Sequence, residues 1–191
     1  NWATYNSVGG ATASNSTKVP DGIIQTGQGF VIGFESTDSN RTLTFNNSMR
    51  LTEHNGQFYR QMSNEMHRYW LNLSDEEVNY NQILVGYLAS ATQGYDTGID
   101  ARMFSYEGNA IYSIIEDEDE KFVIQGRSLP FEESDVIKLG FRAINTGNYS
   151  ISLDSLDGTF ESDNLLIYLK DNFSQTQHNL KEGAYSFVSD E

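Results

Sequence analysis

Short segments with the composition of β-strands recur along the chain and constrain its fold more than any other feature. Each segment is rich in aromatic and β-branched residues and is bounded by Gly, Asn, Ser or Asp. No segment of helical length carries a clean apolar stripe with a 3.6-residue period. The predicted strands are residues 29–36, 42–47, 57–62, 67–74, 81–90, 110–116, 121–129, 135–143, 147–156, 164–171 and 184–190.

The close spacing of these segments predicts an all-β fold, an antiparallel β-sandwich of jelly-roll-like type with about ten to twelve strands. Apolar and polar side chains alternate in residues 147–156, as in a strand with one buried face. The run "QILVGYLA" (82–89) is apolar without alternation, which predicts a central strand covered on both faces. We therefore expect Trp70 and Leu84 to be buried.

The chain length suits one domain, since 191 residues lie within the common range of about 100–200. Residues 1–22 are rich in Gly, Ser, Asn, Thr and Ala. We interpret them as an N-terminal linker or long surface loop, which Trp2 or Tyr5 would pin onto the sandwich. Residues 23–191 are predicted to form a single β-sandwich domain. Because residue 1 is Asn, we expect the chain to be a piece of a longer protein.

The charge balance narrows the range of partners. Lysine and arginine total 12 against 27 aspartates and glutamates, a net charge of −15. Nucleic acid is excluded as a partner because phosphate binding needs a basic surface, and an anionic membrane would repel the chain. No apolar run approaches the roughly 20 residues that span a bilayer. The absence of cysteine excludes disulfides and thiolate chemistry, and the composition resembles that of exported β-proteins.

No motif for catalysis stands out, so we predict no catalytic residue and no enzyme activity. The glycine-rich run at residues 27–33 precedes a predicted strand rather than the helix of a nucleotide-binding fold. The histidines lie outside any recognisable triad or metal-binding spacing. Two carboxylates suffice for glycoside hydrolysis, but solvated turn acids are the favoured interpretation of the candidates. Those candidates are Asp96, Asp100, Glu107, Glu116, Asp154 and Asp157.

Calcium is the strongest hypothesis for a site. The motif "YDTGID" supplies Asp96 and Asp100, and "SLDSLDG" supplies Asp154 and Asp157. Calcium takes six to eight oxygen ligands, so an acidic loop with glycines is chemically adequate. Asp and Gly are also the residues that ordinary β-turns prefer. The candidate metal ligands are therefore these four aspartates, but plain turns are the favoured interpretation of both motifs.

Aromatic residues provide the second signal. The chain contains 11 Tyr, 11 Phe and two Trp, together 13% of its residues. Exposed Tyr and Trp stack well against sugar rings, whereas buried ones serve as cross-strand pairs. The candidates for ligand binding in loops are Trp2, Tyr5, Tyr95 and Tyr106.

The order of the motifs resembles a region near the C-termini of surface and secreted proteins of Bacteroidetes, notably flavobacteria, which type IX secretion exports. The resemblance spans about residues 22 to 188. It is carried by "GIIQTGQGFVIGF", "LTFNNSMR", "RYWLNLSD", "NQILVGYLASATQGYDTGIDARMF", "AIYSI", "FVIQGRSLPFEESDVIKLGFRA", "GNYSISLDSLDGTF", "LLIYLKDN" and "HNLKEGAYSF".

The resemblance implies a non-catalytic β-sandwich module of an extracellular or cell-surface protein, with a role in adhesion or surface presentation. Its expected partners are other surface proteins or other domains of the same polypeptide. A carbohydrate-binding module of a secreted polysaccharide-processing protein is the alternative. Bacteroidetes also attach glycans at a short Asp-Ser/Thr-apolar motif, which "DSL" (154–156) resembles, so Ser155 is a candidate glycosylation site.

Overall fold

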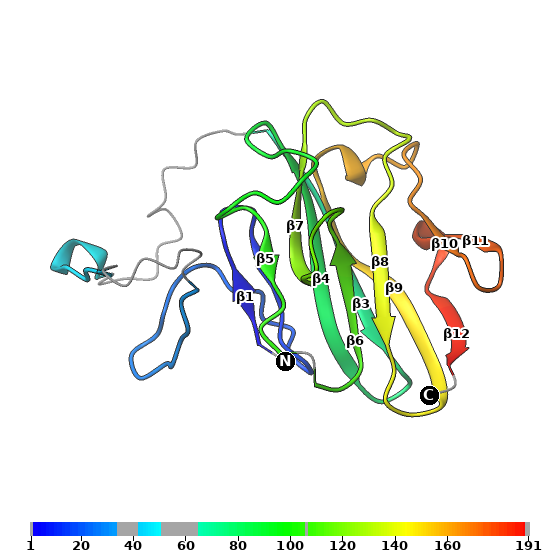
Figure 1. Cartoon of the computed structure of the whole chain (residues 1–191), viewed down its shortest axis with the longest axis horizontal. Coiled ribbons are helices and arrows are strands. Elements are labelled where there is room, and N and C mark those ends of the chain that lie inside the picture. The colour runs from blue at the N-terminus through cyan, green and yellow to red at the C-terminus, as the bar shows by residue number, and fades with distance from the viewer. Residues whose placement is uncertain (1, 34–41, 51–64, 106, 190–191) are drawn as a thin grey trace. The chain divides into compact units, whose positions relative to one another are not determined.

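The chain is described by a computed structural model (Figure 1). Contacts divide it into two compact units, one formed by Asn1–Ile23 with Glu65–Glu191 and the other by Ile24–Asn64. Each unit is considered separately below. The described residues are 2–33, 42–50, 65–105 and 107–189.

The described residues form twelve β-strands and three short 3-10 helices, which confirms the prediction of an all-β, sandwich-like fold. The strands are β1 (Thr4–Tyr5), β2 (Gly10–Ala11), β3 (Met66–Ser74), β4 (Asn79–Leu88), β5 (Ala101–Arg102), β6 (Ala110–Ile114), β7 (Phe122–Ser128), β8 (Lys138–Arg142), β9 (Gly147–Asp157), β10 (Tyr168–Asp171), β11 (Thr176–Asn179) and β12 (Tyr185–Ser189). The 3-10 helices are η1 (Asn47–Met49), η2 (Gly158–Glu161) and η3 (Leu180–Glu182).

Eight of the strands form one sheet. Its order is β12-β9-β3-β4-β7-β6-β8, and β5 pairs with β7 beside this path. All neighbours are antiparallel except β4 and β7, which run parallel. β1 pairs with β2, and β10 pairs with β11, in two small separate sheets.

The large sheet curls so that its two ends meet. The ring of Phe141 in β8 lies 5.2 Å from that of Tyr149 in β9 and 4.9 Å from that of Phe187 in β12, measured between centroids. β8 is the last strand at one end of the sheet, and β12 and β9 are the first two at the other end. The ring contacts between them therefore close the sheet around a core (Figure 1). We call the enclosed side of the sheet the inner face. Its buried members include Tyr69, Leu71, Leu73, Ile83, Val85, Tyr87, Ile111, Tyr149 and Ile151.

The opposite side of β3, β4 and β7, here called the outer face, is also buried. Trp70 and Leu84 point to it and are 8% and 0% exposed, which confirms the prediction that both are buried. Val8 and Ala11, from the N-terminal segment, pack against them. Because both faces of β4 are covered, residues 81–88 are buried without interruption, as the lack of alternation predicted.

Residues 1–22 belong to the same unit as the sheet. The segment adds hydrogen bonds to its apolar contacts. Trp70 Nε1 donates to the carbonyl oxygen of Gly10 (2.8 Å), and Arg68 Nη1 donates to that of Val8 (2.7 Å). A segment rich in Gly, Ser and Asn has the composition of a linker, yet its few apolar residues and its backbone carbonyls complete the outer face.

A pair of glycines makes this close packing possible. Gly86 of β4 stands opposite Gly126 of β7 in the parallel ladder. A Cβ atom on Gly86 would lie 2.4 Å from Val8 Cγ1, and one on Gly126 would lie 2.3 Å from Ile99 Cγ2. Both distances are far below the contact distance of two carbon atoms, about 3.5–4.0 Å. The glycines thus leave the space in which the two covering side chains sit.

Two predicted strands in the second unit are wrong in the residues that the structure describes. Neither residues 29–33 nor residues 42–46 form a strand, although the rings of Phe30 and Phe45 meet edge to face at 5.9 Å. A strand needs a partner for its backbone groups, and these segments have none among the described residues. The predicted strand at residues 57–62 lies outside the described part of the chain.

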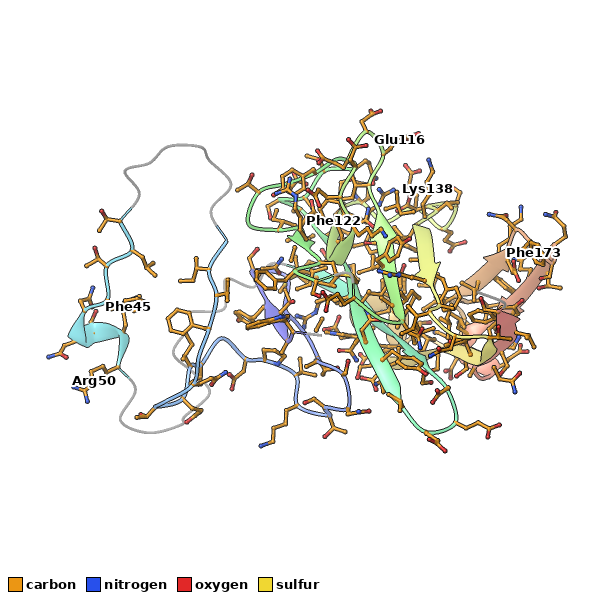
Figure 2. All side chains as sticks on the ribbon, turned by 60° about the horizontal axis from the view of Figure 1, so that its bottom comes forward. Phe45, Arg50, Glu116, Phe122, Lys138 and Phe173 are labelled. Atoms are coloured by element: carbon orange, nitrogen blue, oxygen red, sulfur yellow. The ribbon has the colours of Figure 1, made fainter. Side chains whose placement is uncertain are left out.

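Phe122 and Phe173 mark the extremes of aromatic burial in the first unit (Figure 2). Phe122 is fully buried in the sheet, whereas Phe173 is 99% exposed at the tip of the β10–β11 hairpin. The turn at this tip is held by Asp171, whose carboxylate accepts hydrogen bonds from the backbone N–H groups of Phe173 (2.7 Å) and Ser174 (3.2 Å). Hydrogen bonds from the hydroxyls of Ser174 and Tyr185, together with these two backbone bonds, lower the pKa of Asp171 to about 2.

Candidate functional site

The aspartates of "GYDTGID" lie in the connection between β4 and β5, as predicted. Asp96 Oδ2 accepts hydrogen bonds from the backbone N–H (2.5 Å) and the hydroxyl (3.0 Å) of Thr92. Asp100 Oδ2 accepts one from the backbone N–H of Asp96 (2.6 Å), and Asp100 Oδ1 accepts one from that of Gly126 (2.7 Å). The two carboxylates therefore close the loop on itself and fasten it to β7.

Asp100 is the buried member of this pair, at 5% exposure. Burial raises the pKa of its carboxyl to about 6, and the hydrogen bonds from the backbone of Asp96 and Gly126 oppose that rise. The loop is also tied to the N-terminal segment. Asn6 Nδ2 donates to the carbonyl oxygen of Ile99 (2.5 Å), and Ser7 Oγ donates to that of Gly98 (2.7 Å). The loop and the segment thus form one continuous covering layer, which we call the outer layer (residues 2–12 and 91–100).

A calcium ion at this loop would have to share oxygens that the protein already uses. Three of the four carboxylate oxygens of Asp96 and Asp100 accept hydrogen bonds from the chain. In the described ranges, no three His, Cys, Asp or Glu side chains gather as a metal-binding group. The calcium site predicted at this loop stays a prediction.

The second predicted pair, Asp154 and Asp157, lies in strand β9, so the prediction of a loop or turn for this motif is wrong. The two carboxylates bond different partners. Asp157 Oδ2 accepts hydrogen bonds from Arg68 Nε (2.7 Å) and Nη2 (2.5 Å) in an ion pair. The Asp154 carboxylate instead accepts one bond from Asn72 Nδ2 (3.2 Å) and one from Gln82 Nε2 (3.0 Å). These bonds connect β9 to β3 and β4, so both aspartates help to hold the sheet together.

Ser155 lies beside Asp154 on the exposed side of β9, with its hydroxyl 3.4 Å from Asp154 Oδ2. A glycan on its hydroxyl would reach solvent without disturbing the core. Glycosylation of Ser155 stays a prediction.

The three predicted aromatic residues that the structure describes have different neighbours. Trp2 is 51% exposed and meets Phe104, which is 61% exposed, edge to face with centroids 5.0 Å apart. The ring of Tyr5 packs over Gly22, where a Cβ atom would lie 2.8 Å from its Cε1. Tyr95 is half-buried, with the Arg102 guanidinium 4.3 Å from its ring centroid. The last candidate, at position 106, lies outside the described residues.

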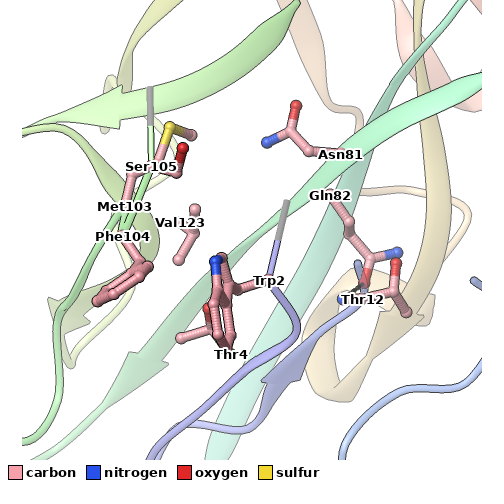
Figure 3. Close-up of a pocket in the computed structure, with 9 residues that line it drawn as sticks. All are labelled: Trp2, Thr4, Thr12, Asn81, Gln82, Met103, Phe104, Ser105 and Val123. Carbon is pink, nitrogen blue, oxygen red and sulfur yellow. Dashed lines mark hydrogen bonds between the residues drawn. The ribbon is translucent and has the colours of Figure 1, made fainter. Parts of the chain in front are cut away.

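A small hollow opens beside Trp2 and Phe104 (Figure 3). Its volume is about 20 Å³, which is room for one water molecule. The amide of Asn81, on its wall, is already bonded to the backbone N–H (2.9 Å) and carbonyl oxygen (2.8 Å) of Ile111. The hollow is lined by Trp2, Thr4, Thr12, Asn81, Gln82, Met103, Phe104, Ser105 and Val123.

A groove of about 630 Å³ runs beside β9 and is the candidate binding site. This volume lies within the range of about 300–1,000 Å³ that is typical of ligand sites. We call it the β9 groove. Its lining residues are Ser152, Leu153, Asp154, Ser155, Leu156, Glu161, Asp163, Leu180, Lys181, Gly183 and Ala184. Asp154 and Ser155 were predicted as candidate site residues, and the other lining residues between 152 and 156 belong to the same strand. The opposite part of the lining comes from η2, η3 and the residues that follow them, which no local pattern linked to β9.

Comparison with models of protein families identifies the family of this chain. A family model described as a domain of unknown function, DUF8693, matches residues 1–191. The chain belongs to the DUF8693 family. Neither a curated protein nor a solved structure gives a significant match. In the described part of this DUF8693 chain, no helix has the length and hydrophobicity that crossing a membrane requires.

One polar cluster of the DUF8693 chain was not predicted. The Asp135 carboxylate accepts hydrogen bonds from Arg127 Nε (3.0 Å), Arg127 Nη2 (2.5 Å) and the Tyr87 hydroxyl (2.9 Å). Burial pushes the pKa of Asp135 up, but the bonds from Arg127 and Tyr87 outweigh it and hold the pKa below its ordinary value. Arg127 and Asp135 flank a loop whose apolar residues Leu129 and Phe131 pack on the inner face. The pair therefore ties that loop over the core.

Proposed function

We propose that this chain is a non-catalytic interaction module of a bacterial surface protein exported by type IX secretion, with a role in adhesion or surface presentation. The observation that carries the proposal concerns the four aspartates that were candidate metal ligands, because their carboxylates are bonded within the fold. Asp96, Asp100, Asp154 and Asp157 all accept hydrogen bonds from the fold itself. A carboxylate engaged in this way stabilises the structure and is poorly placed to act as a general acid or base.

The charge and the groove support the same role. A net charge of −15 favours solubility and discourages non-specific association outside a cell. The β9 groove is open and has acidic residues on its rim, as suits contact with another protein or another domain of the same polypeptide. The resemblance to exported proteins of Bacteroidetes adds the location, at the cell surface or in the medium.

Surface labelling of the organism that encodes the chain tests this proposal. Antibodies raised against the purified domain are expected to label intact cells or to detect the protein in the medium. Loss of both signals in a strain without type IX secretion would support the export route. Labelling that appears only after the cells are permeabilised would contradict the proposal.

Carbohydrate binding is the second candidate function, because Trp2 and Phe104 are exposed next to each other beside a polar hollow. Aromatic rings stack on sugar rings, and polar side chains beside them give orientation. Retardation of the domain in a polysaccharide gel that Trp2→Ala abolishes, and that Phe173→Ala leaves unchanged, would favour this function over the first.

A further inference from the structure

Strand β12 covers only part of β9. The β9–β12 pairing runs from Gly147 to Ile151 on β9, where Tyr185 begins β12. On its other side, β9 is paired with β3 as far as Asp157. Among the described residues, no strand pairs with the β12-side edge of residues 152–157. The unpaired part of β9 therefore presents backbone N–H and carbonyl groups that another chain can use.

The β9 groove runs along this unpaired edge. Five consecutive residues, 152–156, line it. Since successive side chains of a strand point to opposite faces, consecutive residues can line one groove only where it faces the edge of the strand. The opposite wall is formed by Leu180, Lys181, Gly183 and Ala184, at the point where the chain approaches β12. The groove therefore lies along the part of β9 that β12 would cover if β12 extended further toward its N-terminal end.

We infer that the β9 groove binds an extended peptide with basic side chains, which adds to the free edge of β9 as a further strand. This inference rests on the proposed role as an interaction module and names the chemistry of the partner. Strand addition obtains its affinity from main-chain hydrogen bonds and its specificity from pockets for alternate side chains.

The charge on the groove selects a basic partner. The carboxylates of Asp154, Glu161 and Asp163 lie on its lining and belong to exposed residues. The single cation of the lining, Lys181, is held in place because its Nζ donates to the carbonyl oxygens of Phe160 (2.7 Å) and Ser162 (2.6 Å). A second copy of the chain would bring the same carboxylates and a net charge of −15 to the interface, so charge disfavours self-association.

The groove also offers apolar contacts between its charged ones. Leu153, Leu156 and Leu180 line it and are half-buried or buried against the inner face. In a bound strand, alternate side chains point to opposite sides. We therefore expect a peptide in which basic and apolar residues alternate.

The test uses the purified chain and a fluorescent, capped peptide of about seven residues in which lysine and valine alternate. Fluorescence anisotropy is expected to show saturable binding, and a peptide of alternating glutamate and valine is expected to show none. Two further peptides carry N-methyl groups on every lysine or on every valine. Because alternate residues direct their N–H groups to opposite edges of a strand, one methylated peptide is expected to lose binding while the other keeps it.

Matched charge variants locate the site. The double variant Glu161→Lys with Asp163→Lys is expected to weaken binding about tenfold or more, because it reverses the charge of the groove. The control, Glu132→Lys with Glu133→Lys, makes the same change of net charge at exposed residues outside the groove and is expected to change the affinity less than about twofold.

Three results would overturn the inference: no binding of the lysine peptide, equal weakening by both double variants, or equal binding of both methylated peptides. Equal weakening would mean non-specific attraction to an acidic protein, and equal binding of the methylated peptides would exclude strand pairing. Surface labelling that succeeds while the peptide fails would reject only the strand-addition site. Failure of the labelling would instead reject the proposed role.

Discussion

Deletion of residues 1–22 is expected to abolish cooperative unfolding of the domain. The deletion removes Val8 and Ala11 from the outer face and leaves Trp70 and Leu84 open to water. It also removes the carbonyl groups that Arg68 and Trp70 bond. The combined loss is at least about 5 kcal/mol, which is comparable to the net stability of a typical domain.

Circular dichroism and dye binding measure this effect. The shortened chain is expected to show a broad, shallow thermal transition and to bind a dye that reports exposed apolar surface. Trp2→Ala in the full chain is the control, because Trp2 lies in the same segment but is exposed. If the shortened chain unfolded as sharply as the full chain and at a similar temperature, the segment would be a dispensable linker.

Asp135→Ala is expected to lower the free energy of unfolding by about 3 kcal/mol, the second large effect. The substitution removes the partner of Arg127 and the acceptor of the Tyr87 hydroxyl. Both side chains of the ion pair are largely buried, at 12% and 13% exposure, so the guanidinium is left with a charge that water solvates poorly. Urea unfolding of the variant and the wild type gives the difference.

Two further variants separate the charge from the packing. The double substitution Arg127→Met with Asp135→Leu removes both charges and is expected to recover much of the loss, since apolar replacement of a buried pair is often neutral. Tyr87→Phe removes only one hydrogen bond and is expected to cost about 1 kcal/mol. A loss below about 1 kcal/mol for Asp135→Ala would contradict the assignment of this pair as a tie over the core.

Seven strands of the large sheet, all except β5, could be predicted because their apolar periodicity is a local property. Residues 81–88 lack alternation for the physical reason inferred, which is burial on both faces. The described parts of residues 29–36 and 42–47 have the same composition without the strand, since pairing depends on a partner and not on the segment itself. The parallel pairing of β4 with β7 could not be predicted either, because no local sequence pattern indicates it.

At the candidate sites, too, local features could be predicted from the sequence, whereas contacts between distant residues could not. That Asp96 and Asp100 lie in a turn follows from the Asp and Gly around them. The hydrogen bond from the backbone of Gly126 to Asp100 could not be predicted in this way, because it joins residues 26 positions apart. The role of residues 1–22 was hidden for a similar reason. Their composition resembles that of a linker, and the space that Gly86 leaves for Val8 exists only once β4 is part of the folded sheet.

Thermal unfolding in calcium and in chelator is the most direct test of the central claim, which is that the aspartates resembling ligands hold the fold. Asp96 and Asp100 already accept hydrogen bonds within the loop, so we expect the same midpoint of unfolding in millimolar calcium and in chelator. A ligand that binds only the folded state must raise its stability. A clear rise with calcium that Asp96→Asn with Asp100→Asn abolishes would contradict the claim and make "GYDTGID" a metal-binding loop.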